Sequence, residues 1–284
     1  MRLDNSRESS NIEDRRGRRM RMGGRGKIGL GTIVLALVAM YFGIDPGVVL
    51  QNATSPTDDT SYSSGPTPSA TPETRFVSKV LADTEDAWDA IFQQKGWGHY
   101  QQPKLVLFNG ATPTACGTGQ SAMGPFYCPG DSKVYLDLSF FKQMAQQLNS
   151  PGDFAQAYVI AHEVAHHVQH LLGVTDQVDQ ARQRGGAVAA NQLSVRVELQ
   201  ADCMAGVWAH HSDTRRNTLE QGDIEEALNA ASAIGDDRLQ QQSQGYVVPD
   251  SFTHGSSAQR MRWFTRGFKS GDTAQCDTFS AATL

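Results

Sequence analysis

The sequence lacks the features of several common protein classes. Its 284 residues include 25 Lys and Arg against 30 Asp and Glu, so the basic surplus typical of nucleic-acid binding is missing. No internal repeat is present, and Gly117-Thr118-Gly119 is too short for a phosphate-binding P-loop. No motif for a Ser or Cys nucleophile stands out either. These absences argue against a nucleic-acid-binding protein, a nucleotide-binding enzyme and a covalent Ser or Cys hydrolase.

Cysteine is also scarce, with four residues at positions 116, 128, 203 and 276 and no C-x-x-C pair among them. Thiolate metal sites usually contain such a pair, so we favour disulfides over a metal site built from cysteine. Four cysteines allow three pairings. We expect Cys116–Cys128, which closes a short loop around a Gly-rich segment, and Cys203–Cys276, which joins the C-terminal tail to a helix.

One long run without charges stands out, the seventeen residues Ile28–Ile44. At about 1.5 Å per residue, a helix of this length covers roughly 25 Å, the short end of what crosses a bilayer. Residues 1–27 contain nine Lys or Arg and four Asp or Glu, whereas the sequence from Asp45 onward is acidic. The positive-inside rule therefore predicts a single-pass signal-anchor at 28–44 in the inner (cytoplasmic) membrane. Residues 1–27 would be cytoplasmic and the rest periplasmic or extracellular.

Other interpretations of this N-terminal region are less favoured. A soluble core helix would show a polar stripe, which Ile28–Ile44 lacks. A cleaved signal peptide would have a shorter basic region and a small-x-small cleavage site. The Arg-rich segment could bind nucleic acid, but beside a membrane span it is better explained as a topology signal.

Residues 45–75 predict a flexible linker, since fifteen of the 24 positions in 51–74 are Ser, Thr or Pro. Such a segment cannot bury enough apolar surface to fold. The remaining domain, 76–284, is long enough for a core of its own. Hydrophobic spacing predicts the following elements. Helices are expected at 76–92, 141–148, 154–172, 192–211 and 224–233, and strands at 104–108, 125–128 and 133–140. A few strands followed by a run of helices indicates a mainly helical α+β domain.

The most informative segment is YVIAHEVAHHVQH, from position 158, which contains the H-E-x-x-H pattern. On a helix, His162 and His166 lie four residues apart on one face and can bind one metal ion. Glu163 is offset by one residue, where it could take a proton from a metal-activated water. We expect His167 and His170 to be surface or supporting groups rather than ligands. A wholly structural zinc site is the alternative, but cysteines do not cluster here.

A third ligand is expected from another helix, because a catalytic zinc site has three protein ligands and an open position. Glu198 lies in a segment of helical period, VELQAD, and would complete a His₂Glu set. Asp202, four residues later, could accept the second N–H of a ligand imidazole and fix its tautomer. Both acids could instead belong to a solvated helix face. Their neighbours look buried, however, and two buried acids without a metal would be costly.

The pattern E-x-x-x-D downstream of H-E-x-x-H resembles the gluzincins at His162, Glu163, His166, Glu198 and Asp202. More closely, the chain resembles up to Phe279 the bacterial membrane-anchored family described as "putative neutral zinc metallopeptidase". The shared segments are SSNIEDRR, Ala115–Cys116, GPFYCP, VYLD, HEVAHHVQH, ELQADC and THGSSAQR. This resemblance implies a zincin-like fold with a small antiparallel sheet, a Zn²⁺ cofactor and endopeptidase activity.

The segment THGSSAQR, residues 253–260, resembles the T-H-P segment followed by Arg in membrane-associated gluzincins, with Gly255 in place of the proline. The resemblance implies that His254 donates a hydrogen bond to the oxyanion formed during hydrolysis, with Arg260 as the second candidate. The expected substrate is an extended peptide or protein segment. Such a peptide commonly pairs with an exposed strand edge, for which we expect Gly119–Pro125.

We therefore expect a membrane-anchored zinc endopeptidase in which Glu163 is the general base and then the general acid. Two alternatives stay open. One is a non-catalytic, membrane-tethered binding or scaffold module that keeps the zincin fold. The other is a zinc hydrolase acting on a non-peptide amide, such as cell-wall material. The presence of Glu163 favours catalysis, because a purely structural metal site has no use for this carboxylate.

Overall fold

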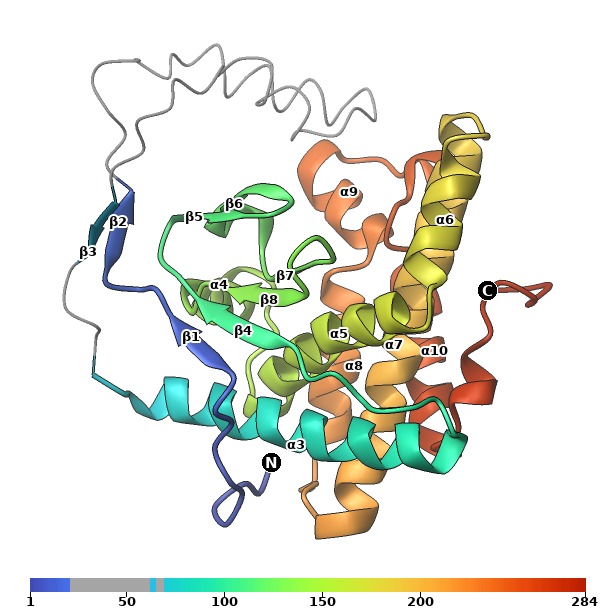
Figure 1. The fold of residues 1–284 in the computed structure, drawn as a ribbon. Coiled ribbons are helices and arrows are strands. Elements are labelled where there is room, and N and C mark those ends of the chain that lie inside the picture. The colour runs from blue at the N-terminus through green and yellow to red at the C-terminus, as the bar shows by residue number, and fades with distance from the viewer. Residues whose placement is uncertain (21–61, 65–68) are drawn as a thin grey trace, which may run out of the picture.

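The computed structural model describes residues 1–20, 62–64 and 69–284. Figure 1 shows a small sheet on one side and a group of helices on the other, with α5 (Asp153–Leu171) and α7 (Ala187–Arg216) in the middle. The mainly helical α+β class predicted from the sequence is confirmed. The arrangement places α5 between the sheet and α7, so residues on α5 can reach both.

The main sheet has the strand order β1-β4-β8-β7. Its strands are β1 (Ile12–Asp14), β4 (Lys104–Leu107), β8 (Lys133–Leu136) and β7 (Phe126–Cys128). The pairs β1–β4 and β4–β8 are parallel, and only β7–β8 is antiparallel. The expectation of an antiparallel sheet is therefore wrong. Parallel neighbours need a long connection, and the chain between β4 and β8 supplies one.

Two further strand pairs complete the strands of the described residues. The connection from β4 to β8 contains β5 (Ala111–Thr114), β6 (Gly117–Gln120), the 3₁₀ turn η1 (Ser121–Met123) and then β7. The strands β5 and β6 pair with each other in antiparallel fashion. The second pair joins β2 (Arg18–Met20) and β3 (Tyr62–Ser64), which are also antiparallel.

The N-terminal residues pack against the rest of the described chain. Strand β1 runs parallel to β4 with Ile12 opposite Leu105, and Leu3 is 6% exposed within the same core. Residues 1–20 are thus part of the folded domain, which disagrees with the prediction that 1–27 form a separate cytoplasmic segment. The predicted anchor at 28–44 lies outside the described residues. Within the described ranges, no helix combines the length and the apolar character that crossing a membrane requires.

Helix α3 (Pro72–Lys95) starts inside the predicted linker. The reason is a strong N-terminal signal: Thr71 caps the helix, forms a capping box with Thr74, and is followed by a proline. The helix ends at Gly96, whose φ of 67° is left-handed. In Figure 1 the helix lies along the base of the domain. Its buried face packs against the hydrophobic core.

The remaining helices follow the prediction in part. Helices α4 (Ser139–Gln147), α5, α7 and α8 (Asp223–Ala233) occur close to where hydrophobic spacing placed them. Three further helices were not predicted: α6 (Val174–Arg182), α9 (Asp236–Gln244) and α10 (Ser257–Ser270). Short 3₁₀ turns are η2 (Pro249–Ser251) and η3 (Thr273–Cys276).

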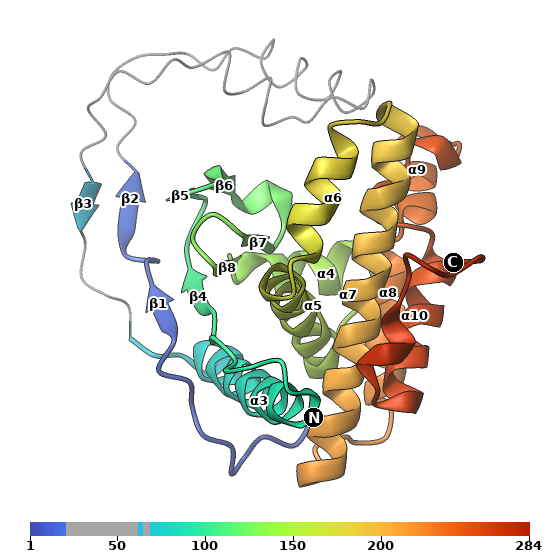
Figure 2. The ribbon, with the colours of Figure 1, turned by 45° about the vertical axis from the view of Figure 1, so that its right-hand side comes forward.

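Helices α7 and α10 pack unusually closely, side by side in Figure 2. A Cβ atom added at Gly206 of α7 would lie 2.2 Å from the carbonyl oxygen of Phe264. One added at Gly267 of α10 would lie 1.8 Å from the carbonyl oxygen of Cys203. Only glycine fits at either position, so the two backbones touch and the register between the helices is set.

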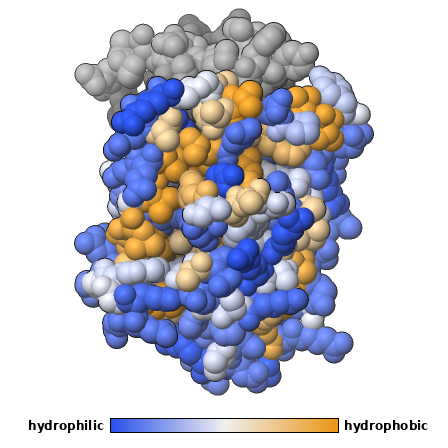
Figure 3. Space-filling model, turned by 90° about the vertical axis from the view of Figure 1, so that its right-hand side faces the viewer, coloured by the Kyte–Doolittle hydropathy of each residue, from blue (hydrophilic) through white to orange (hydrophobic). Residues whose placement is uncertain are grey.

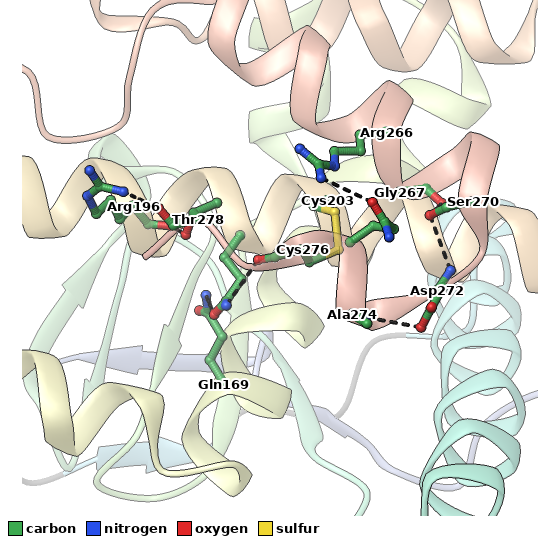
Figure 4. Close-up of a disulfide and its surroundings, with 12 residues drawn as sticks. Gln169, Arg196, Cys203, Arg266, Gly267, Ser270, Asp272, Ala274, Cys276 and Thr278 are labelled. Carbon is green, nitrogen blue, oxygen red and sulfur yellow. Dashed lines mark hydrogen bonds between the residues drawn. A yellow bond between two sulfur atoms is a disulfide. The ribbon is translucent and has the colours of Figure 1, made fainter. Parts of the chain in front are cut away.

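Both expected disulfides are present. Cys116–Cys128 joins the β5–β6 turn to strand β7, and Cys203–Cys276 joins α7 to η3 (Figure 4). The second disulfide is enclosed by the core, with both cysteines at most 1% exposed. The face drawn in Figure 3 is largely hydrophilic, with hydrophobic residues gathered in its upper half. The two disulfides therefore cross-link separate elements of the domain.

Candidate metal centre

Two helices bring the predicted ligands together. Helix α5 contributes His162 and His166 from one face, as their spacing requires, and α7 contributes Glu198. The Nε2 atom of His162 lies 3.1 Å from one carboxylate oxygen of Glu198, and the Nε2 atom of His166 lies 3.5 Å from the other. One ligand atom from each residue lies within 4.8 Å of the others. Three donor atoms therefore converge on one point.

The donor set fits a zinc ion by its chemistry, since imidazole nitrogens and a carboxylate oxygen are ligands that zinc prefers. Each ring nitrogen lies near its own oxygen of Glu198, at 3.1 and 3.5 Å, so the carboxylate lies close enough to both rings to share one ion with them. The Nδ1 atoms of both imidazoles bond to other groups, so each ring presents Nε2 to the centre. Two imidazoles and one carboxylate leave a fourth position open, as in catalytic rather than structural sites.

His162 is held by a buried group of polar residues. Its Nδ1–H donates to Asp202 at 2.9 Å, and Asp202 also accepts from the Tyr158 hydroxyl at 2.5 Å. Arg260 of α10 donates to both oxygens of Asp202, at 2.8 and 2.9 Å. Asp202 is fully buried and Arg260 is 2% exposed. The structure thus places Asp202 where it accepts a hydrogen bond from His162 and orients the imidazole.

The charges at this centre affect one another strongly. Burial raises the pKa of Glu198, but the charge of His166 and the hydrogen bond from His162 hold it well below its usual range. Burial lowers the pKa of His162, but the charge of Asp202 and its hydrogen bonds to Asp202 and Glu198 raise it to about 10. The imidazoles and the carboxylates of this centre therefore each favour the charged form of the other.

Glu163 lies beside this centre on α5 and is 8% exposed. Burial raises its pKa, with the charges of His166 and His162 acting in the opposite direction. Among the described residues, no hydrogen bond occupies its carboxylate. A buried carboxylate that is free of partners and has a raised pKa is suited to accept a proton.

His254 lies in the turn between α9 and α10, held by Asp236. Its Nδ1 lies 3.2 Å from Asp236, whose other oxygen accepts the backbone N–H groups of Thr253, His254 and Gly255. Burial lowers the pKa of His254, but the hydrogen bond to Asp236 and the charge of Glu198 raise it. The ring is 52% exposed, so it can reach a bound molecule.

Gly255 explains a departure from the membrane-associated gluzincin pattern. Its φ is +93°, and its N–H donates to Asp236 at 2.9 Å. Proline has no N–H and holds φ near −65°, so it could not replace this glycine. The turn that presents His254 is therefore built differently here.

Arg260, the second candidate for the oxyanion donor, donates its N–H groups to Asp202. Its guanidinium is committed to Asp202 and also approaches the carbonyl oxygen of Ile234. His167 donates from Nε2 to the Gln101 carbonyl at 2.6 Å and accepts from Tyr127 at 3.0 Å. Burial lowers the pKa of His167 to about 4, so its ring is neutral. The structure therefore places neither Arg260 nor His167 among the groups that converge on the centre.

The strand edge beside α5 also differs from the expected edge, Gly119–Pro125. Gly119 and Gln120 belong to β6 and pair with β5, and residues 121–123 form η1. Strand β7 is the edge of the main sheet on this side, and its Tyr127 bonds to His167 of α5. The edge nearest the site is thus Phe126–Cys128, immediately after the expected segment.

Sequence reasoning missed several supporting residues. Tyr158 and Gln169 bond to Asp202 and His166, and Asp236 orders the turn that carries His254. Gln169 could have been found from its spacing, since it follows His166 by three residues on the same helix face. Asp236 had no comparable signal, because it meets the turn from 18 residues upstream in the sequence.

A second group of acids, Asp153, Asp223 and Glu226, lies apart from this centre. The α-amino nitrogen of Met1 lies 3.0 Å from Asp153 and 3.3 Å from Asp223. Glu226 accepts the backbone N–H of Phe154 at 3.0 Å. These acids already have partners, and their role is to hold the N-terminal residues and the start of α5.

Comparisons with known proteins identify a family and several relatives. A family model described as "Putative neutral zinc metallopeptidase" matches residues 1–279. The chain is 54% identical over 288 residues to the uncharacterized protein YpfJ of Escherichia coli K12, covering 98% of this chain and 99% of that protein. It is 43% identical over 259 residues to the uncharacterized proteins Rv2575 of Mycobacterium tuberculosis and Mb2605 of Mycobacterium bovis, covering 87% of this chain and 86% of each. No solved structure matches the chain.

Proposed function

The chain belongs to the family described as "Putative neutral zinc metallopeptidase", and from this premise we propose that it is a zinc-dependent endopeptidase. The observation that supports the proposal is the convergence of His162, His166 and Glu198, with the free carboxylate of Glu163 beside them. A structural metal site has no use for a buried, unpartnered acid at that position.

In this proposal each residue has a defined chemical task. His162, His166 and Glu198 hold zinc, which when bound acidifies a water and polarises a carbonyl. Glu163 takes the proton of the attacking water and passes it to the leaving amine. His254, whose ring is oriented by Asp236, donates a hydrogen bond to the oxyanion.

The proposed substrate is an extended peptide lying along the outer edge of β7. A peptide there could add a strand to the sheet through backbone hydrogen bonds, which suits segments of varied sequence. The hydrogen bond between Tyr127 of β7 and His167 of α5 holds this edge beside the ligand helix. Side-chain preference would then depend on the residues around the edge.

We also propose that the domain works outside the cytoplasm, because the four cysteines form two disulfides. A single membrane crossing at residues 28–44, as predicted from the charge pattern, does not fit the packing of β1. A single crossing would separate residues 1–20 from the domain, whereas β1 pairs with β4 in the structure. The proposal therefore puts residues 1–20 and 69–284 on the same, outer side of the membrane.

The test is metal content together with cleavage of an unfolded protein by the full chain. We expect about one zinc per chain and zinc-dependent cleavage. Glu163→Gln keeps the shape of the side chain and removes the base, so zinc should stay bound while cleavage falls on the order of 10²–10⁴-fold. Glu225→Gln, the same change at an exposed position of α8, is the matched control and should cleave like the wild type.

Three outcomes separate the candidate functions. A wild-type chain that binds no zinc would remove the metal centre. A zinc-loaded chain that cleaves neither peptides nor unfolded proteins would support the binding-module alternative. Cleavage by Glu163→Gln at the wild-type rate would exclude the assigned base.

A further inference from the structure

The two ligand histidines are oriented by different kinds of group. His162 donates from Nδ1 to the carboxylate of Asp202, whereas His166 Nδ1 lies 2.8 Å from the amide oxygen of Gln169. Gln169 is fully buried, three residues after His166 on α5. A fully buried amide is costly unless its polar atoms are bonded, so its contacts need an explanation.

The orientation of the Gln169 amide is determined by its other contacts. Its nitrogen donates to the backbone carbonyl of Val197 at 2.8 Å and to the side-chain oxygen of Gln200 at 3.0 Å. A backbone carbonyl can only accept, so the nitrogen must face Val197 and the oxygen must face His166. This arrangement requires the proton of the neutral His166 ring to be on Nδ1, which leaves the Nε2 lone pair for a metal.

This series of hydrogen bonds continues through Gln200 to Cys276, which forms a disulfide with Cys203. Gln200, which is 8% exposed, donates from its amide nitrogen to the carbonyl oxygen of Cys276 at 3.2 Å. That carbonyl again fixes the direction, so the Gln200 oxygen faces Gln169. In Figure 4, Gln169 on α5 points toward Cys276, which the disulfide ties to α7.

The C-terminal segment that contains Cys276 forms further hydrogen bonds with α7. Arg196 of α7 donates to the backbone carbonyls of Thr278 and Ala281, and Thr278 donates back to the Arg196 carbonyl at 2.6 Å. Figure 4 shows Arg196 next to Thr278. The Cys276 carbonyl is therefore a fixed acceptor rather than part of a loose tail.

We propose that Gln169 and Gln200 are positioning residues that hold the His166 imidazole for the metal, supported by the segment that Cys276 anchors. The proposal rests on the zinc site proposed above. It assigns the C-terminal segment, far from the H-E-x-x-H motif in sequence, a role in metal affinity. Partners of ligand histidines contribute on the order of 10- to 100-fold to metal affinity or activity.

The test measures zinc affinity of the full chain by competition with a chelator, together with the visible absorption spectrum of the Co²⁺-loaded protein. Gln169→Leu should weaken zinc binding on the order of 10- to 100-fold and alter the Co²⁺ spectrum, because His166 loses its acceptor. Gln200→Leu should give a smaller loss, since Gln169 keeps its bond to Val197. The double variant should bind zinc no more weakly than Gln169→Leu.

Gln192→Leu, the same change at an exposed position of α7, is the matched control and should keep wild-type affinity. Wild-type zinc affinity in Gln169→Leu or in Gln200→Leu would overturn the proposal while leaving the zinc site intact. Additive losses in the double variant would also overturn it, because the two residues would then act separately. If Gln169→Leu does not fold, the affinity of Gln200→Leu decides. A wild-type chain that binds no zinc would instead contradict the proposed function.

Discussion

Asp202 is in contact with Tyr158, His162 and Arg260 at once. Arg260 is a buried cation whose nearest anionic partner is this carboxylate, so the pair links α7 to α10. Removing one member of a buried ion pair leaves an uncompensated charge, which costs far more than the net value of the pair. Asp202 should therefore matter for folding as well as for metal binding.

Asp202→Asn is expected to lower the free energy of unfolding by about 3–5 kcal/mol, because Arg260 is left without a counter-charge. Zinc affinity should fall on the order of 10- to 100-fold through His162. Urea unfolding of the metal-free protein and chelator competition measure the two effects separately.

The double variant Asp202→Asn/Arg260→Met removes both charges and is the control for this prediction. It should recover much of the lost stability but not the zinc affinity, since His162 still lacks its carboxylate. A single variant as stable as the wild type would show that the pair contributes little to folding.

At the scale of elements, hydrophobic spacing predicted helices that have a regular apolar face, but it did not predict α6, α9 and α10. Helix α9, DDRLQQQSQ, has one large hydrophobic residue, Leu239, and that residue is exposed. Its position depends on contacts of Asp236 with the turn at 253–255, which no local pattern reveals. Strand β1 was also missed, because its three residues, IED, resemble a polar segment until β4 pairs with them.

The candidate ligands could be chosen from the sequence because His162 and His166 lie four residues apart on one helix, a spacing that puts them on one face. The structure places Glu198 near both rings and Asp202 against His162. The polar groups that orient them come from other elements. Arg260 and Gln200 reach the site only through the packing of α10 and of the C-terminal segment.

Strand β1 should respond to acid through Glu13, which bonds to Arg15 at 2.8 Å and to Lys133 of β8 at 3.0 Å. The hydrogen bond from Arg15, aided by Lys133 and opposed by burial, lowers the pKa of Glu13 from about 4.5 to about 2. A lowered carboxyl pKa stabilises the fold above the unfolded value. This stabilisation should be present above pH 4.5 and lost as the pH falls toward 2.

Urea midpoints measured between pH 5 and pH 2 check this prediction. Glu13→Gln should make the decline over this window shallower, while Glu8→Gln, at an exposed position of the same segment, should leave it unchanged. An identical decline in Glu13→Gln and the wild type would show that Glu13 has no part in it.

At the scale of the whole molecule, the packing of β1 on β4 predicts membrane topology. Because all four cysteines form disulfides, single cysteines can be introduced without background labelling. In intact spheroplasts, a membrane-impermeant maleimide should label both Asn5→Cys and Lys269→Cys, which are exposed in the structure. Labelling of Lys269→Cys alone would restore the cytoplasmic N-terminus predicted from the charge pattern and contradict the packing of β1.

The pairing of β1 with β4 also has a consequence for the order in which the chain folds. Ile12 lies opposite Leu105, so β1 pairs with a strand that is synthesised 93 residues later. At about 5–20 residues per second, synthesis separates the two by roughly 5–20 s. The β4, β8 and β7 strands can assemble from nearby sequence, while β1 must wait for them. During that interval β1 has no sheet partner, so its backbone N–H and C=O groups are open to water and to chaperones.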